Sequence, residues 1–77
     1  MITKTENLTN HEYDSSAVKK SSYNHDQRTL TVEFTSGKIY RYFNIEKSVF
    51  EEFTYAMSQG TAFHNILKGN YDYEEVE

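Results

Sequence analysis

The stretch of residues 30–43, LTVEFTSGKIYRYF, constrains the fold of this chain more than any other. Apolar and polar residues alternate in its first half, and β-branched and aromatic residues fill both halves. This pattern is typical of two strands joined as a β-hairpin. Ser36-Gly37 lies at the centre, and Gly37 can adopt the positive φ that a tight turn requires. The stretch therefore predicts a hairpin at the heart of a sheet.

Two registers are possible for this hairpin, and they place the two tyrosines of its second strand differently. A two-residue loop at Ser36-Gly37 pairs Phe34 with Ile39, Val32 with Arg41 and Leu30 with Phe43. Tyr40 and Tyr42 then share a face with Thr31 and Glu33, opposite the core. A three-residue loop, Thr35-Ser36-Gly37, pairs Val32 with Tyr40 and turns both tyrosines toward the core. We favour the two-residue loop, although it leaves Arg41 on the buried side, where only its aliphatic stem could pack.

The segments before the hairpin are more polar. Residues 1–14 show no hydrophobic periodicity, which predicts a flexible N-terminal arm. Residues 15–23, SSAVKKSSY, predict a weaker strand anchored by Ala17, Val18 and Tyr23. Its lysines are typical of an edge strand, where they discourage further pairing. Residues 24–27, NHDQ, then predict a turn.

Helical periodicity follows the hairpin. Apolar residues recur at the spacing of one amphipathic face, at Ile45, Val49, Phe53, Ala56 and Met57. Either Asn44 or the segment starting at Glu46 begins this helix, and it should end near Gly60. A second, short helix is expected over residues 61–67, with Thr61 as its N-cap.

This order of elements predicts an α+β domain: a three-stranded antiparallel β-meander followed by two helices packed on one face. The domain should span residues 15–71, with Tyr71 as its last packed residue. An acidic tail at 72–77 should follow. The expected core comprises Val18, Leu30, Val32, Phe34, Ile39, Phe43, Ile45, Val49, Phe53, Met57, Phe63 and Ile66.

Composition narrows the functional classes. The chain has 77 residues and no cysteine, which excludes disulfides and Cys-based zinc sites and fits a reducing compartment. It has neither a secretory h-region nor an apolar run of the ~20 residues needed to span a bilayer, so we expect a soluble, cytoplasmic protein with no membrane partner. The net charge of −4 argues against binding nucleic acid by charge alone. Without the tail acids, the predicted domain is nearly neutral.

No arrangement of residues in the sequence indicates catalysis. His11, His25 and His64 lack metal-binding spacing, so no metal or other cofactor is expected. Adjacent glutamates on a helix point in different directions and do not converge on one reacting atom. Ser15-Ser16 lacks both a neighbouring base and the strand-turn-helix setting of a nucleophile elbow. We therefore expect a protein that is not an enzyme. An enzyme or a small-molecule binder is the third hypothesis, after the two described below.

The chain resembles the KTSC domain, which is named for its position at the C-terminus of some lysyl-tRNA synthetases and also occurs alone in bacteria and phages. The resemblance extends over residues 15–71. It rests on Ser15-Ser16, Tyr23, Leu30-x-Val32-x-Phe34, Ser36-Gly37, Tyr40-x-Tyr42, Ile45, Val49, Phe53, Ala56-x-Ser58-x-Gly60, Phe63, Asn65, Ile66 and Tyr71. The chain departs from the family pattern at Glu46, where proline is common, and at Ser21 in an unusually polar first strand. The association with a synthetase implies RNA as a ligand.

Two functional hypotheses follow. The first is a non-catalytic module that binds RNA by stacking bases on aromatic rings beside basic groups. Its expected ligand-binding residues are Tyr40, Tyr42, Arg41, Lys38 and Lys20. The competing interpretation of the two tyrosines is that they are packing residues. The second hypothesis is a protein-interaction module, such as a phage-encoded inhibitor or modulator of a host protein, that uses a sheet edge. The sequence does not fix the oligomeric state.

Overall fold

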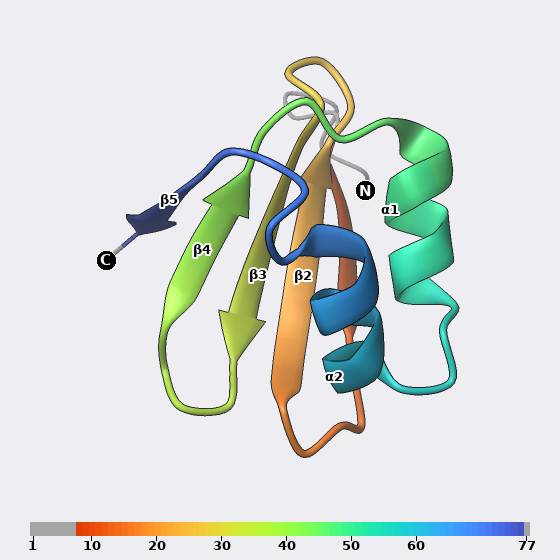
Figure 1. Cartoon of the computed structure of the whole chain (residues 1–77), viewed down its shortest axis with the longest axis vertical. Coiled ribbons are helices and arrows are strands. Elements are labelled where there is room, and N and C mark those ends of the chain that lie inside the picture. Colours follow the sequence, from red (N-terminus) through yellow and green to blue (C-terminus); the bar gives the residue numbers. More distant parts are fainter. Residues whose placement is uncertain (1–7, 77) are drawn as a thin grey trace, which may run out of the picture.

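A computed structural model describes residues 8–76 as one antiparallel sheet covered on one face by helices (Figure 1). The strands are β1 (Leu8–Glu12), β2 (Val18–Asn24), β3 (Thr29–Phe34), β4 (Ile39–Tyr42) and β5 (Tyr73–Val76), and they lie in that order across the sheet. The helical elements are α1 (Lys47–Thr54), α2 (Gln59–Ala62) and the π-helical turn η1 (Phe63–Leu67), which continues α2. The α+β class and the single covered face are as predicted.

The sheet has five strands, so the prediction of three is wrong. The additional strands are the two edges: β1 comes from the predicted arm, and β5 comes from the predicted tail. Neither segment has the apolar alternation of a buried strand, because most of its side chains are exposed. On β1 the partly buried residues, Thr9 and His11, are polar. The rest of the predicted arm, residues 1–7, lies outside the described residues.

The structure also corrects the position of β2, which is an interior strand between β1 and β3. Its lysines do not guard an edge. The Nζ atoms of Lys19 and Lys20 lie 3.8 and 3.7 Å from the carboxylate of Glu33 on β3. The register between the two strands shifts between Val18 and Lys20, which is the irregularity of a β-bulge. Cross-strand ion pairing therefore explains the two lysines.

The β3–β4 hairpin has the three-residue loop, so the register that we favoured from the sequence is wrong. The Phe34 N–H donates to the Lys38 carbonyl at 2.8 Å, and Val32 lies opposite Tyr40 and Leu30 opposite Tyr42. Gly37 closes the turn with φ of 98°, and its N–H donates to the Phe34 carbonyl at 2.9 Å. This loop turns both tyrosines toward the helices and moves Arg41 to the other face of the sheet.

The first helix is shorter than its apolar spacing predicts and ends at Thr54. The buried side chain of Gln59 ends it, since its Nε2 donates to the carbonyls of Thr54 and Ala56 at 3.3 and 2.9 Å. Ser58, rather than Thr61, caps α2 and accepts from the Thr61 N–H at 3.3 Å.

Two further helix positions differ in part from prediction. Glu46 is the N-cap of α1, which confirms the second of the two starts considered, whereas Asn44 has φ of 61°. Gly60 lies inside α2 and does not end a helix. A Cβ atom there would lie 3.2 Å from the Cβ of Ala17, so the glycine lets the helix approach the chain before β2.

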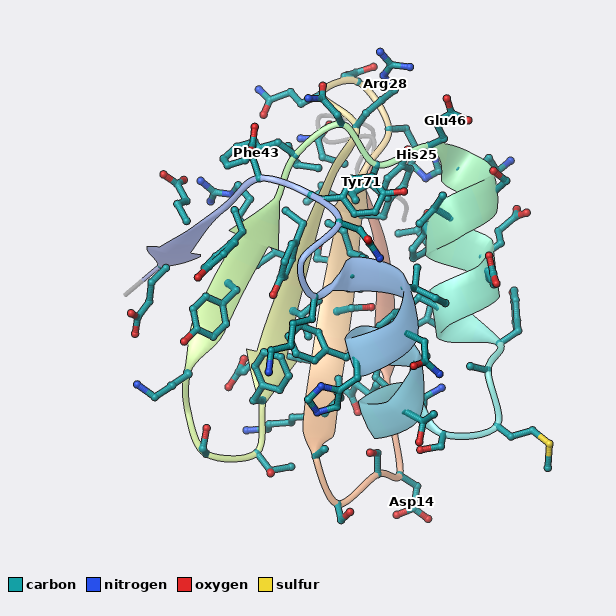
Figure 2. The ribbon with its side chains drawn as sticks, in the orientation of Figure 1. Asp14, His25, Arg28, Phe43, Glu46 and Tyr71 are labelled. Carbon is teal, nitrogen blue, oxygen red and sulfur yellow. The ribbon has the colours of Figure 1, made fainter. Side chains whose placement is uncertain are left out.

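The hydrophobic core lies between the sheet and the helices. Its buried members are Val18, Tyr23, Leu30, Val32, Tyr42, Ile45, Phe50, Phe53, Ala62 and Leu67. Four predicted members, Phe34, Val49, Phe63 and Ile66, are partly buried against this cluster. Three predicted core residues are wrong. Met57 is fully exposed because α1 has already ended, and Ile39 faces the side of the sheet without helices. Phe43 lies beyond the end of β4 (Figure 2).

Candidate functional site: an aromatic pocket beside β4

A pocket lies on the helix-bearing face of the sheet, beside β4 and β5. Figure 1 shows that these two strands extend beyond the helices. Its volume is about 380 Å³. We call it the aromatic pocket, because five of its lining residues are Phe34, Tyr40, Tyr42, Phe63 and Tyr73. The other lining residues are Ala17, Thr35, Ser36, Lys38, Lys68 and Gly69. Apolar walls with a few polar groups are typical of ligand sites.

The hairpin and the π-helical turn together build this pocket. The three-residue loop places Tyr40 and Tyr42 on the same face, two residues apart along β4. Phe63, the first residue of η1, lies across from them, with its ring 5.0 Å from that of Phe34 and 6.0 Å from that of Tyr42. Tyr73 on β5 pairs with Tyr42 in the sheet and forms the outer wall. Three separate segments of the chain therefore converge.

The aromatic rings meet mostly edge to face. The ring of Tyr40 is inclined by 73° to that of Phe34 and by 78° to that of Tyr73, with centroids 5.8 and 5.5 Å apart. This geometry is favourable for aromatic pairs. It leaves ring faces that are not stacked on a neighbouring ring, and the side chain of Tyr73 is 59% exposed. A planar ligand could stack on these faces.

Three of the five predicted ligand-binding residues line this pocket, namely Lys38, Tyr40 and Tyr42. The other two lie on the opposite face of the sheet. Arg41 donates from Nη1 to Glu74 at 2.8 Å, and Lys20 is ion-paired with Glu33. The five residues therefore do not form one surface, because neighbouring residues on a strand point to opposite faces.

Sequence reasoning did not predict Phe63, Lys68, Gly69 and Tyr73 as part of a site. Phe63 was assigned to the core, which it contacts only in part. Tyr73 carried a usable signal: the alternation Tyr71-x-Tyr73 matches the period of a strand. Lys68 carried none, because its place at the pocket depends on how η1 ends.

The two most buried tyrosines differ in their surroundings. Burial raises the pKa of Tyr23, with a further increase from Glu46 that Arg28 opposes, and the Tyr23 hydroxyl donates to the Ile45 carbonyl at 2.6 Å. Burial, followed by the neighbouring phenols of Tyr73 and Tyr40, raises the pKa of Tyr42 to about 12. Both phenols are therefore neutral at physiological pH and can donate a hydrogen bond.

Residues 8–76 contain no group of three or more His, Asp or Glu side chains able to hold a metal ion. The three histidines serve other contacts: His11 and His25 lie against Phe50, and His64 lies against Phe63. Within the same range, no helix has both the length and the apolar character that crossing a bilayer requires.

Fold and pocket together define a small α+β domain with a site of ligand size. The chain belongs to the KTSC domain family, whose sequence model matches residues 14–71. The lysine–tRNA ligases of Nostoc punctiforme, Trichormus variabilis and a further Nostoc strain are 38, 40 and 41% identical to it over 63 residues. These 63 residues are 82% of this chain but only 11% of each ligase.

A solved structure agrees with the fold. The crystal structure of a KTSC domain protein from Yersinia pestis matches with a TM-score of 0.83 at 24% identity, over 91% of this chain and 99% of that one. The family match begins after β1 and ends before β5, so both edge strands lie outside it.

Proposed function

We propose that this protein is a non-catalytic module that binds single-stranded RNA through the aromatic pocket. The observation that carries this proposal is the convergence of Tyr40 and Tyr73 with Lys38 and Lys68 at one pocket. Unpaired bases stack on aromatic side chains, while nearby cations contact the phosphates. The relatives named lysine–tRNA ligases support an RNA ligand, because they carry a domain like this one.

The net charge of −4 sets limits on this binding. A protein with a negative balance gains little from long-range attraction to phosphate. Its RNA affinity would come mainly from stacking, at about 1–3 kcal/mol for each base. We therefore expect RNA binding with only a weak dependence on salt.

The test is a backbone-amide NMR titration with short single-stranded RNAs at low and at physiological salt. We expect shifts at residues 38–42, 68, 69 and 73 that persist at physiological salt. A Tyr40→Ala, Tyr73→Ala double variant should abolish them. Tyr55→Ala is the matched control, because Tyr55 is a 75% exposed tyrosine outside the pocket.

The contrary results are equally specific. Shifts that vanish at physiological salt, or that survive in the double variant, would exclude the pocket as an RNA site. Loss of binding in a Lys20→Ala, Arg41→Ala variant alone would instead place the RNA on the opposite face of the sheet. The circular dichroism spectrum of each variant shows whether its fold is retained.

A protein-interaction module is the second candidate. Two large apolar side chains, Tyr55 and Met57, are exposed in the connection between α1 and α2. Exposed aromatic residues and methionine are enriched at protein interfaces. A partner that co-purifies with the chain, and is lost from a Tyr55→Ser, Met57→Ser variant but not from the pocket variant, would favour this function.

A further inference from the structure

The aromatic pocket contains a buried tyrosine whose hydroxyl has no partner in the described part of the chain. Tyr42 is only 3% exposed, yet its hydroxyl makes no hydrogen bond within residues 8–76, unlike those of Tyr13 and Tyr23. No buried side-chain nitrogen or oxygen atom among these residues lacks a partner. The Tyr42 hydroxyl must therefore reach open space, and the space that Tyr42 lines is the pocket.

A phenol in this position can recognise the edge of a ligand. Its hydroxyl remains protonated, so it donates one hydrogen bond and can also accept one. Buried tyrosine hydroxyls usually have a partner, and a few polar groups in an apolar pocket set the orientation of a ligand. The complementary ligand carries a carbonyl oxygen or a ring nitrogen at the edge of a plane.

The size of the pocket limits that ligand to one planar group. Its volume of about 380 Å³ lies near the lower end of ligand sites, which span roughly 300–1,000 Å³. The edge-to-face rings of Tyr40 and Tyr73 offer one wall for stacking and another for edge contact. A single base fits this description, whereas a base pair does not.

Two lysines suit the pocket to an anion. Lys38 and Lys68 both line it, one directly after the hairpin turn and the other directly after η1. Lys38 has a weak carboxylate contact, with its Nζ 3.9 Å from Glu75, and Lys68 has no ion pair within residues 8–76. Ser36, which also lines the pocket, adds a neutral donor. These groups can contact one phosphate.

We propose that the aromatic pocket binds one unstacked nucleotide, with its base against Tyr40 and Tyr73 and its phosphate at Lys68 and Lys38. The Tyr42 hydroxyl contacts the edge of the base and makes the site selective among the four bases. The nucleotide is either a free mononucleotide or an unpaired residue of an RNA. Only the second source rests on the proposed RNA-binding function.

The experiment titrates the whole ¹⁵N-labelled chain with AMP, GMP, CMP and UMP in turn. It then uses single-stranded RNA hexamers and a double-stranded RNA. We expect saturable shifts at Tyr42, Lys68 and Tyr73, a preference for one or two of the mononucleotides, and no pocket shifts with double-stranded RNA. Uncharged nucleosides should bind more weakly than their monophosphates, and Lys68→Ala should reduce that difference.

Tyr42→Phe is the decisive variant, because it keeps the packed ring and removes only the hydroxyl. One net hydrogen bond is worth about 1 kcal/mol, so the preferred mononucleotide should bind about fivefold more weakly. The other mononucleotides should be affected less, which would level the base preference. Tyr55→Phe removes an exposed hydroxyl outside the pocket and should leave every affinity unchanged.

The outcomes separate this inference from the proposed function. If each mononucleotide binds Tyr42→Phe as tightly as it binds the unmodified chain, the proposed role of the hydroxyl is wrong. If hexamers shift the pocket residues and mononucleotides do not, the single-nucleotide site is wrong and RNA binding stands. If mononucleotides bind and hexamers bind no more tightly, the site stands and the RNA function fails. No pocket shifts with either would overturn both.

Discussion

Two groups of aromatic residues lie on the same face of one sheet, and they differ in how they are packed. The group under α1, which we call the α1 cluster, comprises Tyr13, Tyr23, His25, Phe50 and Phe53. The other group lines the aromatic pocket. Rings in both groups meet mostly edge to face, but the α1 cluster also contains a stacked pair, Tyr23 and Phe50, with centroids 4.6 Å apart at 7°. The pocket rings instead surround a hollow.

The hydroxyl groups show the difference most clearly. In the α1 cluster, the Tyr23 hydroxyl donates to a backbone carbonyl, and that of Tyr13 bonds Ser21 at 2.7 Å and Thr54 at 3.2 Å. In the pocket, the hydroxyls of Tyr40, Tyr42 and Tyr73 have no hydrogen-bond partner within residues 8–76. A tyrosine whose ring is packed and whose hydroxyl is hydrogen-bonded within the protein contributes to stability. One whose hydroxyl opens into a cavity remains available to a ligand.

The largest expected effect compares alanine substitutions in the two groups. Tyr23→Ala removes a fully packed ring and should lower the free energy of unfolding by about 3–5 kcal/mol, the range for large aromatic residues in a core. Tyr73→Ala removes a ring that is 59% exposed and should cost under about 1 kcal/mol. Urea denaturation followed by circular dichroism measures both. Similar losses from the two variants would contradict the distinction between core and site.

The next effect concerns pH and the phenol of Tyr42. Its pKa in the folded protein is about 12, against an ordinary value of 10.0. Between these values the folded state holds the proton and the unfolded state releases it, so stability is complete below pH 10 and falls as the pH rises toward 12. The loss should approach about 2–3 kcal/mol, at 1.36 kcal/mol for each unit of pKa.

Denaturation midpoints at several pH values between 9 and 12 measure this loss. Tyr42→Phe has no phenol to ionise, so its stability should decline less over that range. Tyr55→Phe lacks an exposed phenol and serves as the control. If Tyr42→Phe and the unmodified chain have parallel pH profiles, folding does not raise the pKa of this phenol.

The same comparison shows what the sequence could predict. Alternating residues at 30–34 predicted β3, and the Asn24 turn is present, with its Oδ1 accepting from the N–H groups of Asp26 and Gln27. These features depend on local chemistry. The hairpin register depended on a difference of one loop residue, and both loops suited the Ser-Gly sequence. Because the period of a strand is two, that one residue decided which face holds Tyr40 and Tyr42.

The limits of the site had a similar cause. Lys38, Tyr40, Arg41 and Tyr42 were identified as a group because they are close in sequence, and Lys20 was added from the strand before the hairpin. Arg41 and Lys20 lie on the other face. Lys68 and Tyr73 reach the pocket from the end of η1 and from an edge strand. Packing of the second helical segment sets the place of Lys68, and pairing of β5 with β4 sets that of Tyr73. The alternation Tyr71-x-Tyr73 could have indicated a strand, but not which strand it pairs with.

A smaller effect should come from removing one hydroxyl from each group. Tyr23→Phe leaves the buried Ile45 carbonyl without its 2.6 Å hydrogen bond, which should cost about 1–2 kcal/mol of unfolding free energy. Tyr40→Phe breaks no hydrogen bond within the described residues and should change stability by less than about 0.5 kcal/mol. Thermal and urea denaturation of the two variants, side by side, test this difference. A larger loss from Tyr40→Phe would show that its hydroxyl is structurally engaged.

The smallest effect concerns the ion pair between Glu75 and Lys38, which lines the pocket. Lys38 and Glu75 are both largely exposed and 3.9 Å apart, so their pairing should contribute under about 1 kcal/mol to stability. Glu75→Gln should therefore leave the denaturation midpoint almost unchanged. It also removes a negative charge that competes with a phosphate for Lys38, so the Kd for the preferred mononucleotide should fall about twofold to threefold.

High salt provides the check on that last effect, because exposed charges are screened over a Debye length of about 3 Å at 1 M. The gain in affinity from Glu75→Gln should therefore disappear in 1 M salt, while the base preference, which depends on stacking and the Tyr42 hydroxyl, should persist. Glu74→Gln is the matched control, since Glu74 pairs with Arg41 on the opposite face. If Glu74→Gln raised the affinity as much as Glu75→Gln, the gain would reflect net charge alone, and Lys38 would have no direct contact with the phosphate.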